Sequence, residues 1–376
     1  MAFSLKILVL GSKEFPVGSS RGFDALASGG MERYTQDFAS ALASKKQEPI
    51  VVTRLFPGQK RAEKTGGVEV RRVSWVKGFF LRNPSFNFFA FLKSLKTDYD
   101  VAFTNGVMAT LVGLALRFFR KKPVIARSAG VAWVQPQYNP LVKTVLKVLE
   151  TLAYSKADTV VFLSKQEVAA FKQKMGFLPP KYEIIPTGVN LSRFDSVKRK
   201  KNKGRKKKIK TILFLGRLLE VKGARFLVEA APLVKAKIII AGEGPEKAKL
   251  ENKVREKKLE NVFFVGQVEK PEKLLAECDV FVLPSLSEGL PIAMLEAMAS
   301  RKPCVVTDIG LPVENGKTAL VVKQGDAKGL AEALNKLLKN ESLAGKIAEN
   351  GFQHVKKNFT WENACRKIIS LAKELA

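Results

Sequence analysis

The chain is poor in the residues that build metal centres, disulfides and histidine chemistry. Its 376 residues include three cysteines and a single histidine, His354. Cys278, Cys304 and Cys365 lie far apart and form no CxxC pair, so neither a disulfide framework nor a zinc site is expected. We therefore expect no metal site, and the scarcity of cysteine favours a reducing cytoplasm.

Long apolar runs are missing as well. The longest nearly apolar run, residues 107–116, is too short to span a bilayer. Residues 1–10 predict a short strand rather than a signal peptide with a cleavage site. We therefore expect a cytoplasmic protein. An apolar fraction of 46% over 376 residues is typical of a globular chain with two domains of ordinary size.

Acidic residues are scarce, and their scarcity is uneven. The formal net charge is +30. Residues 1–196 carry 29 Lys and Arg against 14 Asp and Glu, and residues 197–210 carry ten basic residues and no acid. Residues 211–376 are closer to balance, with 26 against 21. The excess indicates an anionic surface or acceptor near the N-terminal half.

Strand-like apolar runs alternate with helical stretches along the chain. This alternation predicts an α/β protein with parallel, doubly wound sheets. We expect one domain over residues 1–196 and a second over 211–360. The basic run 197–210 between them is too charged to pack, and it has two interpretations, a solvated spacer or a binding site.

The stretch 279–296 is the most informative. An apolar run, 279–283, predicts a buried strand, and Pro291 suits the first position of the helix that follows. Glu288 then lies in the loop, and Glu296 lies on the helix among apolar residues. A buried carboxylate needs hydrogen-bond donors, which sugar hydroxyls supply, and a helix N-terminus suits phosphate. On spacing alone, both acids could equally be solvated surface residues.

Two further strand-like runs end in residues suited to an anionic ligand. Residues 211–216 are followed by Arg217 and Lys222, and residues 236–241 by a Gly-Glu-Gly-Pro turn. Ligands of parallel α/β sheets bind at the carboxyl ends of strands. Two cations there suit a diphosphate, and the glycines allow a close backbone approach.

These segments together resemble retaining glycosyltransferases of the GT-B fold, family 4 (glycosyl transferases group 1). The resemblance spans nearly the whole chain and is strongest over residues 211–300. The matching segments are Gly29-Gly30-Met31-Glu32-Arg33, Ile185 to Asn190, Gly216-Arg217 with Lys222-Gly223, Ala241 to Pro245, Val265 to Val268, Asp279 to Ser285, Glu288-Gly289, Glu296 to Ala299 and Phe359 to Glu362. It implies two Rossmann-like doubly wound domains facing a central cleft, with a last helix at about 361–376 packing back on the first.

The resemblance also implies roles for individual residues. Arg217 and Lys222 would hold the donor diphosphate, and Glu288 would face the transferred sugar or phosphate; these three form the expected catalytic set. Glu296 would accept hydrogen bonds from the ribose, and the backbone at Val268 would meet the nucleobase. The remaining donor-binding residues are Gly29 and Gly30, which would close over the phosphate, and Gly289 and Leu290 at the helix start. Gly29-Gly30 can also be an ordinary flexible loop tip.

The implied activity is transfer of a sugar, with retention, from a nucleotide-diphosphate sugar to a lipid-linked or cell-surface glycan acceptor. No metal and no cofactor are implied. Two alternatives stay open: a nucleotide-sugar epimerase of the same fold, and a basic nucleic-acid-binding protein. The latter is disfavoured because no recognisable nucleic-acid-binding motif is present.

The chain departs from the family in two places. Relatives often carry a histidine after the strand that here ends near residue 127, and this chain has none there. The segment 308–316 looks shortened, which leaves its contacts with the sugar open. His354 itself lies on a polar stretch and is expected at the surface.

Basic and aromatic residues meet between residues 71 and 96. This mixture predicts attachment to an anionic membrane, with Phe79 and Phe80 as contacts if they are exposed. The aromatic residues Phe86, Phe88, Phe89 and Phe91 recur at helical spacing, which favours a place in the core.

Overall fold

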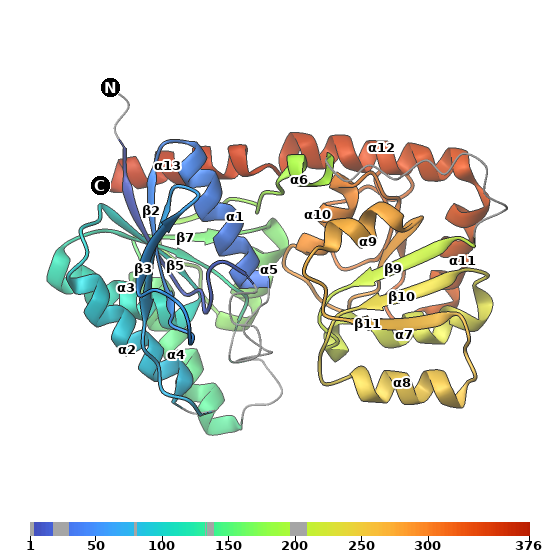
Figure 1. Ribbon diagram of the computed structural model, residues 1–376, viewed down its shortest axis with the longest axis horizontal. Coiled ribbons are helices and arrows are strands. Elements are labelled where there is room, and N and C mark those ends of the chain that lie inside the picture. Colours follow the sequence, from blue (N-terminus) through green and yellow to red (C-terminus); the bar gives the residue numbers. More distant parts are fainter. Residues whose placement is uncertain (1–3, 18–29, 79–80, 132, 134–138, 196–208) are drawn as a thin grey trace. The chain divides into compact units, whose positions relative to one another are not determined.

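The computed structural model describes residues 4–17, 30–78, 81–131, 133, 139–195 and 209–376 (Figure 1). The chain divides into two compact units, residues 1–188 with 361–376, and residues 189–360. The boundary falls before the expected residue 196 because α6 (Leu191–Asp195) packs on α9 and α10 of the second unit. Gly29, Phe79, Phe80 and residues 197–208 of the basic run lie outside the described residues.

The first unit is built on an eight-stranded sheet in the order β3-β4-β2-β1-β5-β6-β7-β8. All neighbouring strands pair in parallel except β3 with β4. The central strands are buried apolar runs, as expected for a sheet covered on both faces. The strands are β1 (Lys6–Leu10), β2 (Glu48–Arg54), β3 (Ala62–Thr65), β4 (Val68–Val73), β5 (Val101–Asn105), β6 (Val124–Arg127), β7 (Thr159–Phe162) and β8 (Tyr182–Ile184).

Helices cover both faces of this sheet. One face carries α2 (Arg82–Leu95), α3 (Val107–Arg120) and α4 (Pro140–Lys156), which pack on Ala102, Val124 and Ala126. The other carries α1 (Gly30–Ser44) and α13 (Trp361–Leu375), on the side of Phe103. Residues 102 and 103 point to opposite faces because side chains alternate along a strand. Helix α5 (Lys165–Met175) packs against β7.

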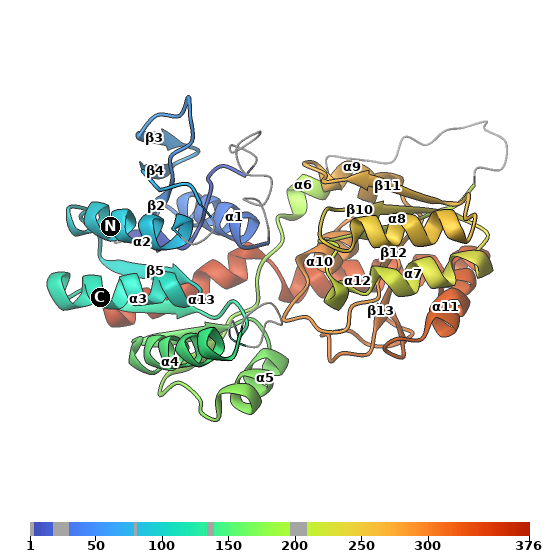
Figure 2. The same ribbon diagram turned by 90° about the horizontal axis from the view of Figure 1, so that it is seen from below.

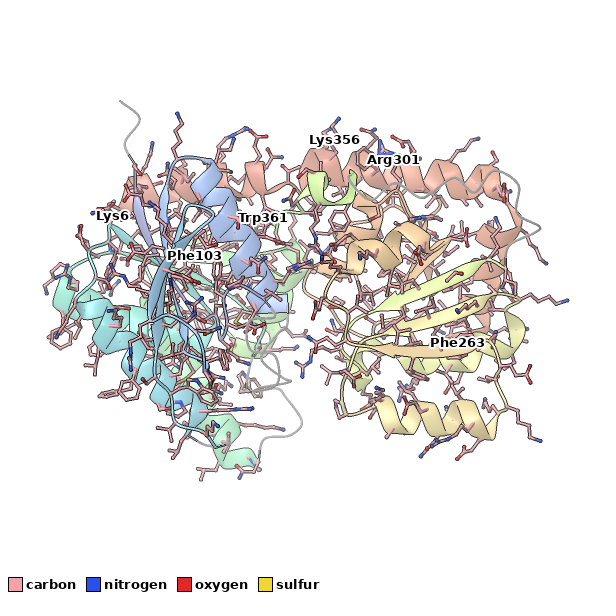
Figure 3. All side chains as sticks on the ribbon, in the orientation of Figure 1. Lys6, Phe103, Phe263, Arg301, Lys356 and Trp361 are labelled. Carbon is pink, nitrogen blue, oxygen red and sulfur yellow. The ribbon has the colours of Figure 1, made fainter. Side chains whose placement is uncertain are left out.

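The last helix, α13, docks on α1 through one aromatic cluster. The Trp361 ring lies 5.1 Å from that of Tyr34, edge-on, and 6.0 Å from that of Phe38. Figure 3 labels Trp361 within the first unit. All three side chains are buried. Aromatic side chains bury large areas and prefer tilted or edge-to-face pairs, so this cluster fixes the C-terminal helix on the first unit.

The aromatic residues of α2 divide between core and surface. Phe86 is buried, but Phe88 is 58% exposed, so the expectation that all four pack in the core is wrong for Phe88. The reason is helical phase, because Phe86, Ala90 and Ser94 share the buried stripe and residue 88 points away. Nearby, the basic side chains Arg71 and Arg72 pair within the unit, with Glu69 and Glu63 respectively.

The second unit contains a six-stranded, wholly parallel sheet in the order β11-β10-β9-β12-β13-β14. Its strands are β9 (Thr211–Leu215), β10 (Lys237–Ala241), β11 (Val262–Gly266), β12 (Val280–Leu283), β13 (Cys304–Thr307) and β14 (Leu320–Val322). Its helices are α7 (Ala224–Ala230), α8 (Lys247–Glu256), α9 (Pro271–Glu277), α10 (Ile292–Ala299), α11 (Ala327–Lys339) and α12 (Glu341–Asn358). Two parallel-sheet α/β units confirm the predicted fold class. Among the described residues, no helix has the length and apolar character needed to cross a membrane.

Removing the Trp361 ring tests the docking of α13. We expect Trp361→Ala to lower the stability of the first unit by about 3–5 kcal/mol, because a buried aromatic ring is lost and leaves a cavity. Thermal unfolding followed by circular dichroism measures the midpoint. Glu362→Ala is the matched control, since Glu362 pairs with Lys45 on the exposed side of the same turn and surface pairs contribute little. Equal midpoints for the two variants would contradict the docking role.

Candidate functional site

The carboxyl ends of the strands in the second unit form the edge at which the predicted site residues gather. From β9 the chain runs to β10 on one side, and after β11 it returns to β12 on the other side of β9. This is a topological switch point, where parallel α/β sheets bind their ligands. Lys222 follows β9 and Glu288 follows β12, so the two residues flank the switch point.

Lys222 and Glu288 form a direct ion pair there. The Lys222 Nζ lies 2.7 Å from each Glu288 carboxylate oxygen, and the Ser285 hydroxyl donates to Oε1 at 2.9 Å. The Glu288 side chain is only 7% exposed, which excludes the interpretation of this acid as a solvated surface residue. An ammonium group has three N–H donors, so Lys222 keeps one for a further acceptor such as a phosphate oxygen.

Glu296 is also buried and paired. It lies on α10 with 6% of its surface exposed, and Arg193 Nη1 is 3.2 Å from its Oε1. Arg193 Nε and Nη2 lie 3.1 and 2.6 Å from Glu272 Oε2 on α9. A solvated surface position is therefore wrong for Glu296 too. The sequence did not indicate Arg193, because it sits on a single-turn helix 103 residues from Glu296.

Helix α10 starts one residue later than predicted. Pro291 is its N-cap, with extended backbone (φ −74°, ψ 110°), and Ile292 is the first helical residue. The N-cap position requires non-helical angles, which proline's fixed φ also allows. The first helical turn therefore keeps all of its amide groups. That of Met294 donates to the Pro291 carbonyl at 3.1 Å, whereas those of Ile292 and Ala293 have no acceptor within the helix. Leu290 is buried and Gly289 is exposed just ahead of them.

Glycines let the loops of this edge pack backbone against backbone. A Cβ on Gly242 would lie 1.8 Å from the Gly216 carbonyl oxygen, and one on Gly223 would lie 1.9 Å from that of Pro284. Both glycines have positive φ, 148° and 66°. The close approach is thus between neighbouring loops. Backbone hydrogen bonds join the same loops, including Leu286 N–H to the Val221 carbonyl at 2.7 Å.

The other predicted residues of the second unit lie along the same edge. Arg217 directly follows the strand end at Gly216 and is exposed, and no ion pair joins its side chain to any described residue. Val268 is half-buried just after β11. Neither contributes to the Lys222–Glu288 pair, and both remain accessible to a ligand.

A cavity of about 460 Å³ opens beyond β13 and β14. Its lining includes Asp308, Asn315 and Gln324 from the shortened segment and its surroundings. The Gln324 side-chain amide donates to the Leu286 carbonyl, which ties this cavity to the loop that carries Glu288. Within the described residues, no group of three or more His, Cys, Asp or Glu side chains is arranged to hold a metal ion.

His354 was expected at the surface, but the structure places it in partly buried surroundings. It is half-buried, its ring packs near Phe359, and Nε2 lies 2.8 Å from the Pro312 carbonyl oxygen. A carbonyl only accepts, so Nε2 carries the proton. The side chain therefore anchors segment 308–316.

The first unit holds a polar cluster that sequence reasoning missed. At the ends of β5, β6 and β7, Arg127 stacks 3.8 Å from the Tyr34 ring centroid and donates to Asn105 Oδ1 at 3.4 Å. Glu167 accepts from the Leu163 amide at 2.6 Å. Burial raises the pKa of the Glu167 carboxyl, opposed by that amide and by Arg127. The signal available in the sequence was the polar residue that ends the apolar runs of β5 and β6, Asn105 and Arg127 respectively. Gly30, the described member of the predicted glycine pair, begins α1 and is exposed.

Comparison with known proteins agrees with this geometry. Residues 28–193 match the family model described as Glycosyltransferase Family 4, and residues 209–340 match the one described as Glycosyl transferases group 1. Sucrose-phosphate synthase from Thermosynechococcus elongatus superposes with a TM-score of 0.82 at 23% identity, over 99% of both chains. Anabaena Alr3699/HepE in complex with UDP and glucose gives 0.78 at 18%, over 99% of this chain and 100% of that one. The fold is thus that of the GT-B glycosyltransferases.

The sequence relatives lead to the same family. N,N'-diacetylbacillosaminyl-diphospho-undecaprenol alpha-1,3-N-acetylgalactosaminyltransferase of Campylobacter jejuni is 28% identical over 359 residues, covering 88% of this chain and 93% of that protein. Together the two family models cover most of the chain. The chain belongs to the group 1 glycosyltransferases, and it is a glycosyltransferase enzyme.

The loop packing at this edge predicts a stability effect for Gly242→Ala. A methyl group there would collide with the Gly216 carbonyl and would require a backbone conformation that alanine rarely adopts. We expect a loss of at least about 1–3 kcal/mol, measured by thermal unfolding. Gly345→Ala in α12 is the control, because a Cβ there meets nothing within 4 Å and alanine favours helix. A Gly242→Ala protein as stable as the wild type would refute the packing role.

Proposed function

We propose that the enzyme transfers a sugar, with retention of anomeric configuration, from a nucleotide-diphosphate sugar to a lipid-linked or cell-surface glycan acceptor. The single observation that carries the proposal is the Lys222–Glu288 pair at the switch point between β9 and β12, just ahead of α10. Lys222 is a cation that keeps one N–H donor, and it lies near the N-terminus of α10. These two features together suit an anionic ligand.

The proposed catalytic roles follow from charge development. Sugar transfer leaves negative charge on the departing diphosphate. Lys222, the exposed Arg217 and the first-turn amides of α10 would stabilise that charge, an effect that often dominates catalysis. Glu288 would hold Lys222 in place and face the transferred sugar. These groups stabilise the leaving group without a metal or cofactor, and we propose that none is used.

The proposed donor contacts use the rest of the edge. Glu296 would accept hydrogen bonds from ribose hydroxyls, the Val268 backbone would meet the nucleobase, and Gly289 and Leu290 would approach the phosphates. Alr3699/HepE has been crystallised with UDP and with UDP-glucose, which supports a nucleotide sugar as donor. Gly29 and Gly30 keep the role that the resemblance implies, closure over the phosphate.

The acceptor proposal draws on the relatives. The Campylobacter jejuni protein is named for a diphospho-undecaprenol substrate, and one from Corynebacterium glutamicum for a phosphatidylinositol monomannoside. A lipid-linked acceptor would place this enzyme in the cytoplasm, peripherally on the inner face of the cell membrane. The net charge of +30 suits such an anionic surface.

Retention and transfer are both open to direct measurement. The single histidine is engaged with the Pro312 carbonyl, so we propose chemistry without a histidine base. A screen of nucleotide sugars by thermal shift would identify the donor, and NMR of the product would assign its anomeric configuration. An epimerase of this fold would leave the donor mass unchanged. An inverted anomer would refute retention.

A matched pair of variants tests the donor site. Glu296 and Glu272 both pair with Arg193, but only Glu296 is proposed to contact the donor. We expect Glu296→Ala to weaken nucleotide-sugar binding by about 1.5–3 kcal/mol, the cost of losing a charged hydrogen-bond partner. Glu272→Ala should bind as the wild type does. Calorimetry on the folded variants measures both affinities.

Two outcomes would count against this assignment. Unchanged binding by Glu296→Ala would remove Glu296 from the site. Equal losses in Glu296→Ala and Glu272→Ala would mean that the effect passes through Arg193 rather than through a direct contact.

A further inference from the structure

Apolar side chains are unusually exposed on three neighbouring helices of the first unit. Of the seventeen large apolar side chains exposed in the described part of the chain, ten lie on α2, α3 and α4. Isolated exposed apolar residues are ordinary, but a contiguous patch marks a site of interaction. The distribution therefore requires an explanation that the sugar-transfer site does not give.

The longest part of the patch is a stripe along α4. Leu141, Val145, Val148 and Leu152 are between 47% and 74% exposed. Their spacing places them on one side of the helix, as in an amphipathic helix that buries this side. The core side of α4 is a different one, formed by Glu150, Ala153 and Tyr154. The helix thus has two apolar sides, and one of them faces solvent.

The end of α3 adds two aromatic rings among cations. Phe118 and Phe119 are 71% and 61% exposed and contact each other edge-on, with centroids 5.2 Å apart. They lie within the run Arg-Phe-Phe-Arg-Lys-Lys, residues 117–122. Lys121 Nζ lies 5.4 Å from the Phe118 ring centroid. Exposed aromatic rings beside cations are typical of side chains at the headgroup level of a membrane.

These side chains belong to one surface. Helix α3 packs between α2 and α4 (Figure 2), and all three helices cover the same face of the first sheet. Their solvent sides therefore point away from the sheet together. Phe88 and Leu92 extend the surface onto α2. We call this surface, formed by the exposed residues of α2, α3 and α4, the α2–α4 face.

Charge identifies what the face fits. The three helices carry seven Lys and Arg residues and one acid, Glu150, which is fully buried. The residues of the three helices therefore give the face a net positive charge around its apolar side chains, although Arg117 pairs with Asp158, just after α4. A second copy of the same face would bring like charges together. Lipid phosphates neutralise the cations, while the acyl boundary accepts the apolar side chains.

We propose that the α2–α4 face docks on an anionic lipid bilayer, with the end of α3 and the stripe of α4 at the headgroup level. This moves the membrane contact from residues 71–96 to a surface whose main part is α3 and α4. The proposal deepens the proposed function, because a lipid-linked acceptor is presented at a bilayer. Each cation near an anionic leaflet strengthens the attachment.

Vesicle sedimentation with the full chain tests the apolar part. The probes are vesicles of equal parts phosphatidylglycerol and phosphatidylcholine, and vesicles of phosphatidylcholine alone. We expect the wild type to bind the anionic vesicles, and Phe118→Ser with Phe119→Ser to weaken this binding about tenfold or more. Leu233→Ser with Phe263→Ser is the control, since both residues are exposed on the second unit and Phe263 also lies beside a lysine, Lys237.

A second pair of variants tests the charge. Lys121→Gln with Lys122→Gln should lower binding several-fold, and moderate salt should lower it further. The control is Lys257→Gln with Lys258→Gln in the second unit. Its backbone conformation is matched as well, because Lys121 and Lys258 both have positive φ, 56° and 50°. This control removes the same charge from elsewhere and should bind as the wild type does. Val145→Ser with Val148→Ser provides a further test if the phenylalanine variant fails to fold.

The outcomes separate the possibilities. Wild-type binding by the phenylalanine and valine variants would overturn the proposal. So would equal binding to neutral vesicles, binding to nucleic acid in place of vesicles, or a wild-type dimer that Phe118→Ser with Phe119→Ser dissociates. No donor or acceptor is present in this assay, so failure of the proposed function, measured by donor binding, is a separate result.

Discussion

A buried carboxylate needs a cation beside it, and the second unit satisfies this need at its switch point. Leaving Glu288 unpaired in its nearly closed position would cost far more than the pair itself contributes. Lys222 reaches it from the strand on the other side of the switch point, and Ser285 adds a hydroxyl. The loops that carry these residues are held by backbone contacts at Gly223. The geometry of this edge therefore depends on the Lys222–Glu288 pair and on Gly223, whose lack of a side chain lets the two loops approach each other.

The same constraint recurs at Glu296. Arg193 satisfies Glu296 and Glu272 together, and it joins α6, α9 and α10. Because Arg193 pairs with Glu296, the protein itself holds this side chain in place. A carboxylate has about four acceptor positions, so a sugar hydroxyl can join Arg193 instead of replacing it. The proposed contact between Glu296 and a ribose hydroxyl would therefore require no prior ordering of this side chain.

The sequence predicted the architecture well because its signals were local. Buried strands, their terminal glycines and the alternation with helices all follow from short patterns, and Lys222, Glu288 and Glu296 were each identified from their place after a strand or on a helix. The pairing of Lys222 with Glu288 depends on strand order, which local patterns do not specify. Arg193 could not be predicted from the sequence, because a helix of one turn is too short to show a hydrophobic periodicity. Phe88 was wrongly predicted to lie in the core because the four aromatic residues were treated as one group. Two residues along a helix from Phe86, its side chain points in a different direction.

Charge has different uses in the two units. In the second unit many lysines and arginines form ion pairs within the unit, as Lys253 does with Glu229. Its basic and acidic residues are nearly equal in number, so these pairs neutralise much of its charge. The helices α2, α3 and α4 contain one acid, and that acid is buried, so the cations of these helices outnumber their acids even though Arg117 pairs with Asp158. The asymmetry along the sequence thus becomes an asymmetry of surfaces. Under the proposed function, a nucleotide-sugar donor would meet a few fixed charges at a strand edge, whereas the proposed membrane surface would meet many cations spread around apolar side chains. Because the proposed donor site needs only a few cations, most of the net charge of +30 would serve the proposed contact with an anionic surface.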